Sequence, residues 1–405
     1  MKVNSLKLKD WIEPEYLAYH LVSIFGERGM AWLDSDGCEN GEFSFLGLNP
    51  KEIIFSNKYN FENPFEILKQ IDKGFWMGWL SYEAGSWLEP KNKWQEPDMA
   101  TLWIASYDPI IKFNLLKKEI SLESLNLNNL KNYKNIIEQI NVSKIKNNIN
   151  QDLIFDFSQI DLKKISKNFR KKIKIIKRLI KEGDIFQANL TTKCEVKTYK
   201  EYNYLDIYLK IRKKLKAPFG GIIIGDLNGE KEGVLSTSPE RFLKTKDKNY
   251  VETRPIKGTR PRNKNKKIDS LNAIDLITNE KDRAENIMIV DLLRNDLGKV
   301  CETGSVIVSE LLKLESYAKV HHLTSVIRGK IKKNKTWIDL LEACWPGGSI
   351  TGAPKVRACQ RIYETEGFDR GPYCGSFIKL NWNGDIDSNI LIRSFILKNK
   401  KIKIY

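Results

Sequence analysis

The chain has 405 residues, 41% of them hydrophobic and 10% aromatic, and its 68 lysines and arginines outnumber 51 acidic residues to give a formal net charge of +17. This composition is typical of a globular protein with a sizeable core, and because no apolar run reaches the roughly 18 residues of a membrane span, it excludes a transmembrane helix and a membrane partner. The lysines are dispersed and no nucleic-acid-binding motif accompanies them, so we expect no nucleic-acid partner, although the basic surface would attract a small anionic substrate.

Six cysteines are scattered along the chain without any Cys-x-x-Cys pair. This spacing argues against a zinc site and against a disulfide framework. The first residues mix charged and apolar side chains and contain no signal-peptide core. Together these features predict a protein of the reducing cytoplasm.

The chain divides by composition into two regions and a connector. Residues 1–115 predict an N-terminal subdomain of strands and short helices rich in aromatic residues. Within it, residues 74–85 combine glycines with large aromatic residues, which suits a tightly packed sheet whose backbones approach closely. Residues 116–155 are dominated by Lys, Asn, Leu, Ile and Glu, and we interpret them as a helix-bearing connector. Residues 156–405 form the second region, which carries the chemically distinctive segments.

In this second region, apolar residues recur at helical spacing over 161–182 and predict an amphipathic helix that ends at Gly183. The alternation that follows predicts a strand over 184–196. The remaining expected elements are helices over 280–291 and 355–366 and strands over 220–227, 233–236, 241–245, 373–382 and 386–397.

The most informative segment is 253–262, in which Lys257 precedes Gly258 and Thr259 and is bracketed by arginines and prolines. The prolines stiffen the backbone, and glycine permits close approach to a ligand. An amine held against an anionic substrate can serve as a nucleophile or a base. Taken alone, the segment is better interpreted as a basic surface turn, which is what most Lys/Arg clusters are.

Asp282 and Glu285 are three residues apart in a predicted helix, which places their carboxylates on one face. Two such carboxylates suit a Mg²⁺ ion that also takes substrate oxygens as ligands. Spacing alone favours the simpler interpretation, a solvated face with ion pairs to Lys281 and Arg283.

Three further features suggest contacts with a substrate. Gly347 and Gly348 precede Ser349 and a predicted helix, and this arrangement offers backbone N–H groups to a carboxylate. Arg393 is expected inside an apolar strand, where it needs a carboxylate partner. His322 follows His321, and a histidine without a supporting motif is more often packed in the core than catalytic.

Taken together, these segments resemble the chorismate-utilising enzymes, a family that includes component I of anthranilate synthase and of aminodeoxychorismate synthase and the isochorismate and salicylate synthases. The resemblance is weak to residue 115, absent across the connector and strong from Gly183 to Arg393. It implies an α+β fold in which antiparallel sheets form a sandwich-like core with flanking helices. It also implies chorismate as the substrate and Mg²⁺ as the cofactor.

The resemblance assigns roles to individual residues of this chain. Glu285 becomes a metal ligand with Asp282 close to the metal, His322 lies beside the reacting ring, and Glu240 is a candidate acid near the leaving hydroxyl. The residues expected to contact substrate are Gly258, Thr259, Ser349, Tyr373 and Arg393.

Two positions separate the branches of the family. Lys257 stands where anthranilate synthases typically have alanine, and it resembles the aminodeoxychorismate-forming branch, in which the lysine attacks the ring. Gln187 stands where the water-adding branch has a lysine, and glutamine cannot act as that base. The implied reaction joins chorismate and ammonia, and because no glutaminase-like arrangement is present, the ammonia would come from a glutamine amidotransferase subunit.

Family members usually continue beyond residue 405 with a glycine-rich strand and a helix that completes the Mg²⁺ site. We therefore expect this sequence to lack part of the metal site. The alternatives to the aminating enzyme are anthranilate synthase component I and an inactive remnant that still binds the amidotransferase.

Overall fold

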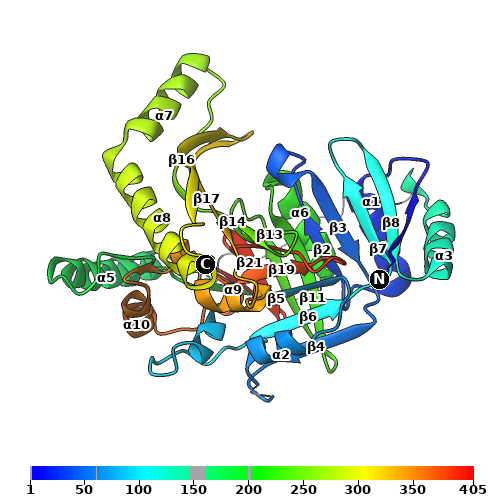
Figure 1. The fold of residues 1–405 in the computed structure, drawn as a ribbon, viewed down its shortest axis with the longest axis horizontal. Helices are drawn as coiled ribbons and strands as arrows, with labels where there is room; N and C mark the ends of the chain where they lie inside the picture. The colour runs from blue at the N-terminus through cyan, green and yellow to red at the C-terminus, as the bar shows by residue number, and fades with distance from the viewer. Residues whose placement is uncertain (1, 61, 144, 146–157, 159, 199–201) are drawn as a thin grey trace.

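The computed structural model describes residues 2–60, 62–143, 145, 158, 160–198 and 202–405. Figure 1 shows two large sheets between outer layers of helices. Within the described ranges each sheet has ten strands and every pairing between strands is antiparallel. In the same ranges, no helix is long and apolar enough to cross a membrane.

The first sheet mixes strands from both ends of the chain. Its order is β1 (Asn4–Lys7), β8 (Glu119–Ser124), β7 (Ile110–Asn114), β3 (Phe43–Gly47), β2 (Ala31–Asp34), β11 (Gly220–Leu227), β12 (Glu230–Ser236), β21 (Ser394–Lys398), β22 (Lys401–Ile404) and β10 (Cys194–Lys197).

The second sheet carries the candidate site at one edge. Its order is β15 (Ile256–Pro261), β17 (Val320–Lys330), β14 (Tyr250–Arg254), β13 (Arg241–Lys246), β20 (Ile386–Asn389), β19 (Ser376–Leu380), β5 (Trp76–Leu80), β6 (Leu102–Ser106) and β4 (Glu52–Ser56), with β16 (Ile307–Ser316) also paired to β17.

The two sheets face each other across an aromatic core. Trp79 of β5 and Trp103 of β6 stack with ring centroids 5.3 Å apart. Gly225 of β11 lies under both rings, since a Cβ there would come within 2.6 Å of Trp79. A Cβ at Gly78 would lie 2.2 Å from the carbonyl oxygen of Trp103, so this glycine lets two backbones approach closely. The predicted α+β sandwich and the tight packing of residues 74–85 are confirmed.

Helices cover the outer faces of both sheets. On the first sheet, the apolar faces of three helices join one core cluster with the strands: α1 (Pro14–Phe25), α3 (Leu127–Glu138) and α6 (Tyr204–Lys214). The second sheet is covered in the same way by α2 (Pro64–Gln70), α8 (Glu280–Val300) and α9 (Trp337–Cys344). The structure also contains α5 (Leu162–Lys181), α7 (Lys266–Thr278), α10 (Lys355–Glu366), the short helices η1 (Glu39–Gly41), η2 (Tyr82–Trp87) and η4 (Gly348–Ile350), and a small sheet of β9 (Gln187–Ala188) and β18 (Gly352–Ala353).

Several predicted elements are confirmed and others are wrong. The helices over 161–182, 280–291 and 355–366 are present, and α8 continues to Val300. The strand predicted over 184–196 is reduced to β9 and β10, because its middle turns to meet the Ser349 loop. The strand predicted over 386–397 is interrupted between β20 and β21, where Arg393 has φ +51°.

Both sheets contain strands from both sides of the predicted domain boundaries. β2 pairs with β11, and β5 pairs with β19, so each sheet joins strands from both predicted regions. The predicted connector 116–155 supplies β8 to the first sheet and α3 to its outer face, while residues 146–157 lie outside the described ranges. The division into subdomains stays a prediction.

Candidate active site

A bulge at the edge of the second sheet positions Lys257. β15 pairs with β17 at Ile256 and again at Thr259, but the register shifts between them. Gly258, inside this irregularity, has φ +89°, which favours glycine, and a Cβ there would lie 2.8 Å from Leu276 and 3.1 Å from Asp282. Because bulges redirect side chains, Lys257 leaves the regular ladder at this point.

Lys257 meets the glycine-rich loop and a buried carboxyl group. Its Nζ donates a hydrogen bond to the carbonyl oxygen of Ser349 at 2.8 Å. Burial raises the pKa of Glu240 to about 7, against the opposing effects of a hydrogen bond from the Ser349 side chain and the charge of Lys257. The fold therefore brings together three residues that are far apart in the sequence: Lys257 on β15, Ser349 on η4 and Glu240 just before β13.

His322 faces the same strand with one nitrogen free. Its Nδ1 lies 2.9 Å from the hydroxyl oxygen of Thr259, and its buried Nε2 has no hydrogen-bond partner among the described residues. Burial and then the charge of Arg393 lower the pKa of His322 to about 4. The ring is therefore neutral at pH 7 and presents an unpaired nitrogen.

Arg393 differs from its predicted setting. It lies just before β21 with φ +51° and is exposed, so the expectation of an arginine inside an apolar strand is wrong. Within the described ranges its guanidinium forms no ion pair with a carboxylate. The positive charge of Arg393 nevertheless lowers the pKa of His322. The exposed guanidinium therefore lies near His322, on the open side of the site.

The candidate metal ligands lie on α8 beside this strand. Asp282 is held by Arg260 at 2.9 Å, and Glu285 lies 3.8 Å from Lys281. Among the described residues, no group of three or more His, Cys, Asp or Glu side chains could hold a metal ion. Glu285 makes only this long contact with Lys281, so its carboxylate is available as one metal ligand. The carboxylate of Asp282 is already neutralised by Arg260.

Tyr373 packs against another aromatic residue. Its ring stacks on Tyr405, with centroids 4.6 Å apart and planes 5° apart. Within the described part of the chain, no hydrogen bond joins it to Lys257, Glu240 or His322. The structure thus brings together the predicted residues Lys257, Glu240, Ser349, Thr259 and His322, and leaves Tyr373 outside this group.

The sequence did not single out Arg370, which braces the loop that carries Ser349. It is almost fully buried and donates to the carbonyl oxygens of Ile350 at 2.9 Å and Asn189 at 2.6 Å. Its charge is balanced by Glu366 at 2.7 Å. The available signal in the sequence was an arginine four residues after a glutamate. Gln187, used only to separate branches, also lies here, with a buried Oε1 that has no partner in the described ranges.

Comparisons with known proteins identify the class to which this fold and site belong. A family model described as chorismate binding enzyme matches residues 38–405. The chain therefore belongs to the chorismate binding enzyme family, and the resemblance inferred from its sequence is confirmed.

Individual relatives refine this assignment. Aminodeoxychorismate synthase component 1 of Escherichia coli (strain K12) is 41% identical over 234 residues, which are 58% of this chain and 50% of that protein. Anthranilate synthase component 1 of Methanothermobacter marburgensis is 30% identical over 408 residues, which cover 94% of this chain and 85% of that protein. The aligned region spans about half the length of the curated aminodeoxychorismate synthase component 1 sequences that it matches.

The fold is shared with a solved structure of the same class. Anthranilate synthase component I from Streptococcus pneumoniae TIGR4 superposes with a TM-score of 0.69 at 24% identity and covers 92% of this chain and 87% of that chain. This likeness supports the fold, whereas the choice between chemical branches rests on the site.

Proposed function

We propose that this chain is component I of an aminodeoxychorismate synthase, which converts chorismate and ammonia to 4-amino-4-deoxychorismate. The observation that carries the proposal is the lysine amine of Lys257, fixed 2.8 Å from the Ser349 carbonyl oxygen beside a carboxyl group with a pKa of about 7. The 41% identity to an aminodeoxychorismate synthase component 1 supports the same branch.

Lys257 and Glu240 divide the chemistry between them. Ionised Glu240 accepts a proton from the Lys257 ammonium group, and the free amine attacks the ring as the C–O bond to the hydroxyl breaks. The proton on Glu240 then leaves with the hydroxyl as water. Ammonia displaces the lysine amine and restores the enzyme. A carboxyl pKa of about 7 suits both proton transfers at neutral pH.

The remaining polar groups bind and orient the substrate. Chorismate carries two carboxylates, and Arg393 is a cation without a carboxylate partner in the described ranges. The neutral ring of His322 directs its unpaired Nε2 at the ring substituents, while Thr259 fixes the other nitrogen at 2.9 Å. The oxygen of Gln187 is a further unpaired group that a bound substrate would satisfy.

We include Mg²⁺ in the proposal, with Glu285 as its protein ligand. A bound Mg²⁺ ion would neutralise a substrate carboxylate and polarise the departing hydroxyl group. Because Asp282 is paired with Arg260, it is better placed to hold that arginine than to bind the ion. The proposal also includes a glutamine amidotransferase subunit as the ammonia donor. It places the enzyme in the cytoplasm, where six unpaired cysteines are stable.

Anthranilate synthase component I is the second candidate, because that relative aligns with 94% of this chain. Incubation of the chain with chorismate, Mg²⁺ and ammonium, followed by mass spectrometry, separates the two candidates. Aminodeoxychorismate is the expected product. Anthranilate with released pyruvate would move the chain to the other branch and contradict the role of Lys257.

A further inference from the structure

Lys379 of β19 is a buried lysine whose amine has no anionic partner. The residue is 7% exposed, and among the described residues no hydrogen bond or ion pair reaches its Nζ. The Nζ atom instead lies 3.7 Å from the centroid of the Phe45 ring, on β3 of the opposite sheet. Lysine side chains are almost never fully buried unless they are paired. The fold by itself therefore leaves this amine incompletely satisfied.

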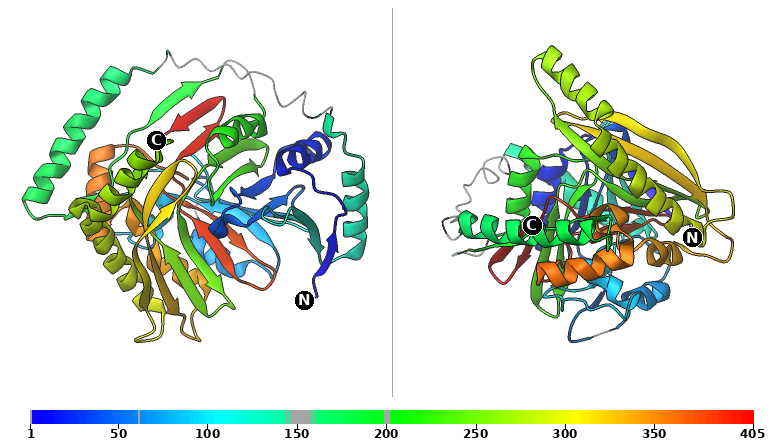
Figure 2. Two further views of the ribbon diagram at one scale, coloured as in Figure 1. Left: turned by 90° about the horizontal axis from the view of Figure 1, so that it is seen from above. Right: turned by 90° about the vertical axis from the view of Figure 1, so that its left-hand side faces the viewer.

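The amine faces a large cavity lined by strands of both sheets. The left-hand view of Figure 2 shows strands of the N-terminal part (blue to cyan) among strands of the C-terminal part (orange to red) at the centre of the molecule. The cavity has a volume of about 1160 Å³, and its walls include Phe45, Phe75, Lys112, Arg241, Lys244 and Lys379. Since one water molecule takes up only about 30 Å³, small molecules have room to reach the amine.

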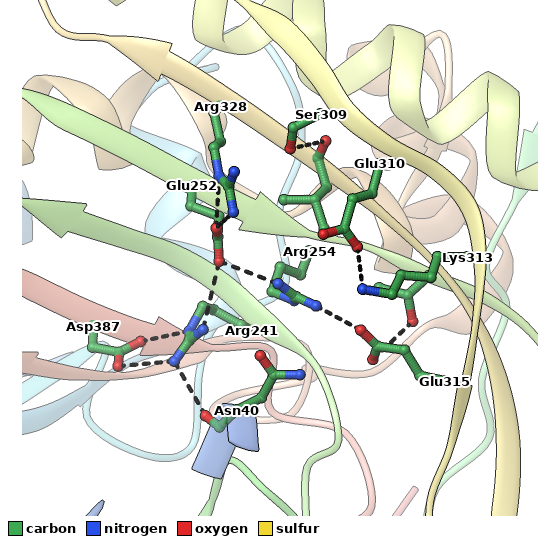
Figure 3. Close-up of polar contacts among 12 residues, drawn as sticks. Asn40, Arg241, Glu252, Arg254, Ser309, Glu310, Lys313, Glu315, Arg328 and Asp387 are labelled. Carbon is green, nitrogen blue, oxygen red and sulfur yellow. Dashed lines mark hydrogen bonds and ion pairs between the residues drawn. The ribbon is translucent and has the colours of Figure 1, made fainter. Parts of the chain in front are cut away.

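Cations outnumber the carboxylate beside Lys379. Asp387 of β20 is directly opposite Lys379 of β19 and, on its other side, opposite Lys244 of β13. Residues opposite each other on neighbouring strands share one face of a sheet. Asp387 already accepts a hydrogen bond from Nε of Arg241 at 3.1 Å, as Figure 3 shows. One carboxylate thus serves three cations, and this row of side chains lacks a negative charge.

The same surroundings keep part of the amine neutral. Burial lowers the pKa of Lys379 to about 8, against the opposing charge of Asp387 and with the help of the charges of Lys244, Arg241 and Lys112. About half of the Lys379 side chains are therefore unprotonated at pH 8. A desolvated, unprotonated lysine amine is a nucleophile, whereas an ammonium group is not.

We propose that Lys379 is a site of reversible modification by carbon dioxide, which converts its amine to a carbamate beside Lys244 and Arg241. The lone pair of Nζ forms a bond to the carbon of CO₂, one C–O π bond becomes a lone pair on oxygen, and one N–H proton passes to solvent. The product carries one negative charge, and the step needs no oxidant or reductant. This site is independent of the proposed synthase chemistry at Lys257.

Carbon dioxide fits the cavity better than a free anion does. It is neutral and apolar, so it enters past Phe45 and Phe75 without the desolvation cost of an ion. Once formed, the carbamate supplies the carboxylate that the row lacks, because its oxygens accept hydrogen bonds from neighbouring cations. The modification would also replace the buried ammonium charge of Lys379 with a paired anion.

The test is carbon-13 NMR of the full chain at pH 8 in labelled bicarbonate, which supplies CO₂. A carbamate resonance distinct from those of bicarbonate and CO₂ is expected. Lys379→Met keeps an unbranched stem against Phe45 and should weaken this resonance at least tenfold. Lys246→Met removes an exposed lysine of the same cavity and, as the matched control, should leave the resonance unchanged. Alkylation with triethyloxonium, followed by peptide mass spectrometry, should locate the trapped group on Lys379.

An unaltered chain without the carbamate resonance overturns the proposal, and so does an equally strong resonance in Lys379→Met. Melting temperatures separate a carbamate from a free anion. Bicarbonate should raise the melting temperature of the unaltered chain and not that of Lys379→Met, while formate, which cannot add to an amine, should have no such effect. An equal rise with formate would replace the carbamate with a bound anion. If Lys379→Met does not fold, Lys379→Arg takes its place, since it keeps the charge and forms no carbamate.

Discussion

Two of the places where the chain buries charge differ in whether each polar group finds a partner. The first is a network centred on Arg241, drawn in Figure 3. Arg241 lies between Asp387 at 3.1 Å and Glu252 at 3.6 Å, and Arg254 links Glu252 to Glu315. Burial alone would raise the pKa of Asp387, but the nearby cations hold it below its ordinary value. Here each carboxylate is balanced, and the network joins β13, β14, β16 and β20.

The second is the group around Lys257, where some buried polar atoms have no hydrogen-bond partner in the described ranges. Glu240 is buried with a pKa of about 7, and the Nε2 of His322 and the Oε1 of Gln187 have no partner in the described ranges. An unpaired buried polar group costs free energy, so its persistence indicates a ligand that satisfies it. In this comparison the paired network around Arg241 supports the fold, and the incompletely paired group around Lys257 is the one that we propose carries the chemistry.

The largest effect is expected at Lys257. Lys257→Ala should lower aminodeoxychorismate formation by about a thousandfold or more, since residues that act as one catalytic unit cannot replace each other. The free energy of unfolding should change little, because the amine makes a single hydrogen bond in the described structure. Lys246→Ala, at an exposed position on β13, is the control for charge. Unchanged turnover in Lys257→Ala would remove the nucleophile from the mechanism.

Disruption of the network around Arg241 should lower the free energy of unfolding. Arg241→Met leaves Asp387 and Glu252 without their shared partner, and breaking a buried ion pair typically costs about 3 to 5 kcal/mol. Urea unfolding should show this loss, while Lys246→Met on the same strand should shift the free energy of unfolding by less than about 0.5 kcal/mol. An Arg241→Met protein as stable as the unaltered one would show that the network does not support the fold.

Glu240 should give a pH-dependent effect. Turnover is expected to rise with pH through about 7 as Glu240 ionises, and Glu240→Gln should lose this rise and about a hundredfold in rate. A rate profile that keeps its rise near pH 7 in Glu240→Gln would assign the proton transfer to another group.

The same residue should affect stability in the opposite direction. Burial raises the pKa from 4.5 to about 7, so between these values the folded state binds more protons than the unfolded chain. Its contribution to stability is therefore present below pH 4.5 and lost as the pH rises through about 7. Melting temperatures of Glu240→Gln measured from pH 5 to pH 8 should lack this loss.

The smallest effect is expected at Thr259. Thr259→Val keeps the shape but removes the hydroxyl group that orients His322, which should lower kcat by about fivefold, as expected for one hydrogen bond of roughly 1 kcal/mol. Thr259→Ser keeps the hydroxyl group and should restore most of the rate. If Val and Ser behave alike, the contact between Thr259 and His322 does not position the ring.

The sequence by itself determined those features of the fold that depend only on residues close together in the chain. Helical periodicity of apolar residues predicted α5, and Gly183, where the helix was expected to end, has φ +78°. The family resemblance was sufficient to name Lys257, Glu240 and His322 before any of them could be seen together. Local patterns carry this information because they are set by conformation within a few residues.

Only the tertiary structure decided which of these residues meet. The register of β15 against β17 places Thr259 opposite His322, and the packing of η4 brings the Ser349 carbonyl oxygen to Lys257. The positive φ of Arg393 ended a strand that alternation had predicted, because the chain has to turn there between the two sheets. Contacts between residues distant in the sequence depend on the packing of the whole chain, and that packing places the proposed chemistry at this edge of the second sheet.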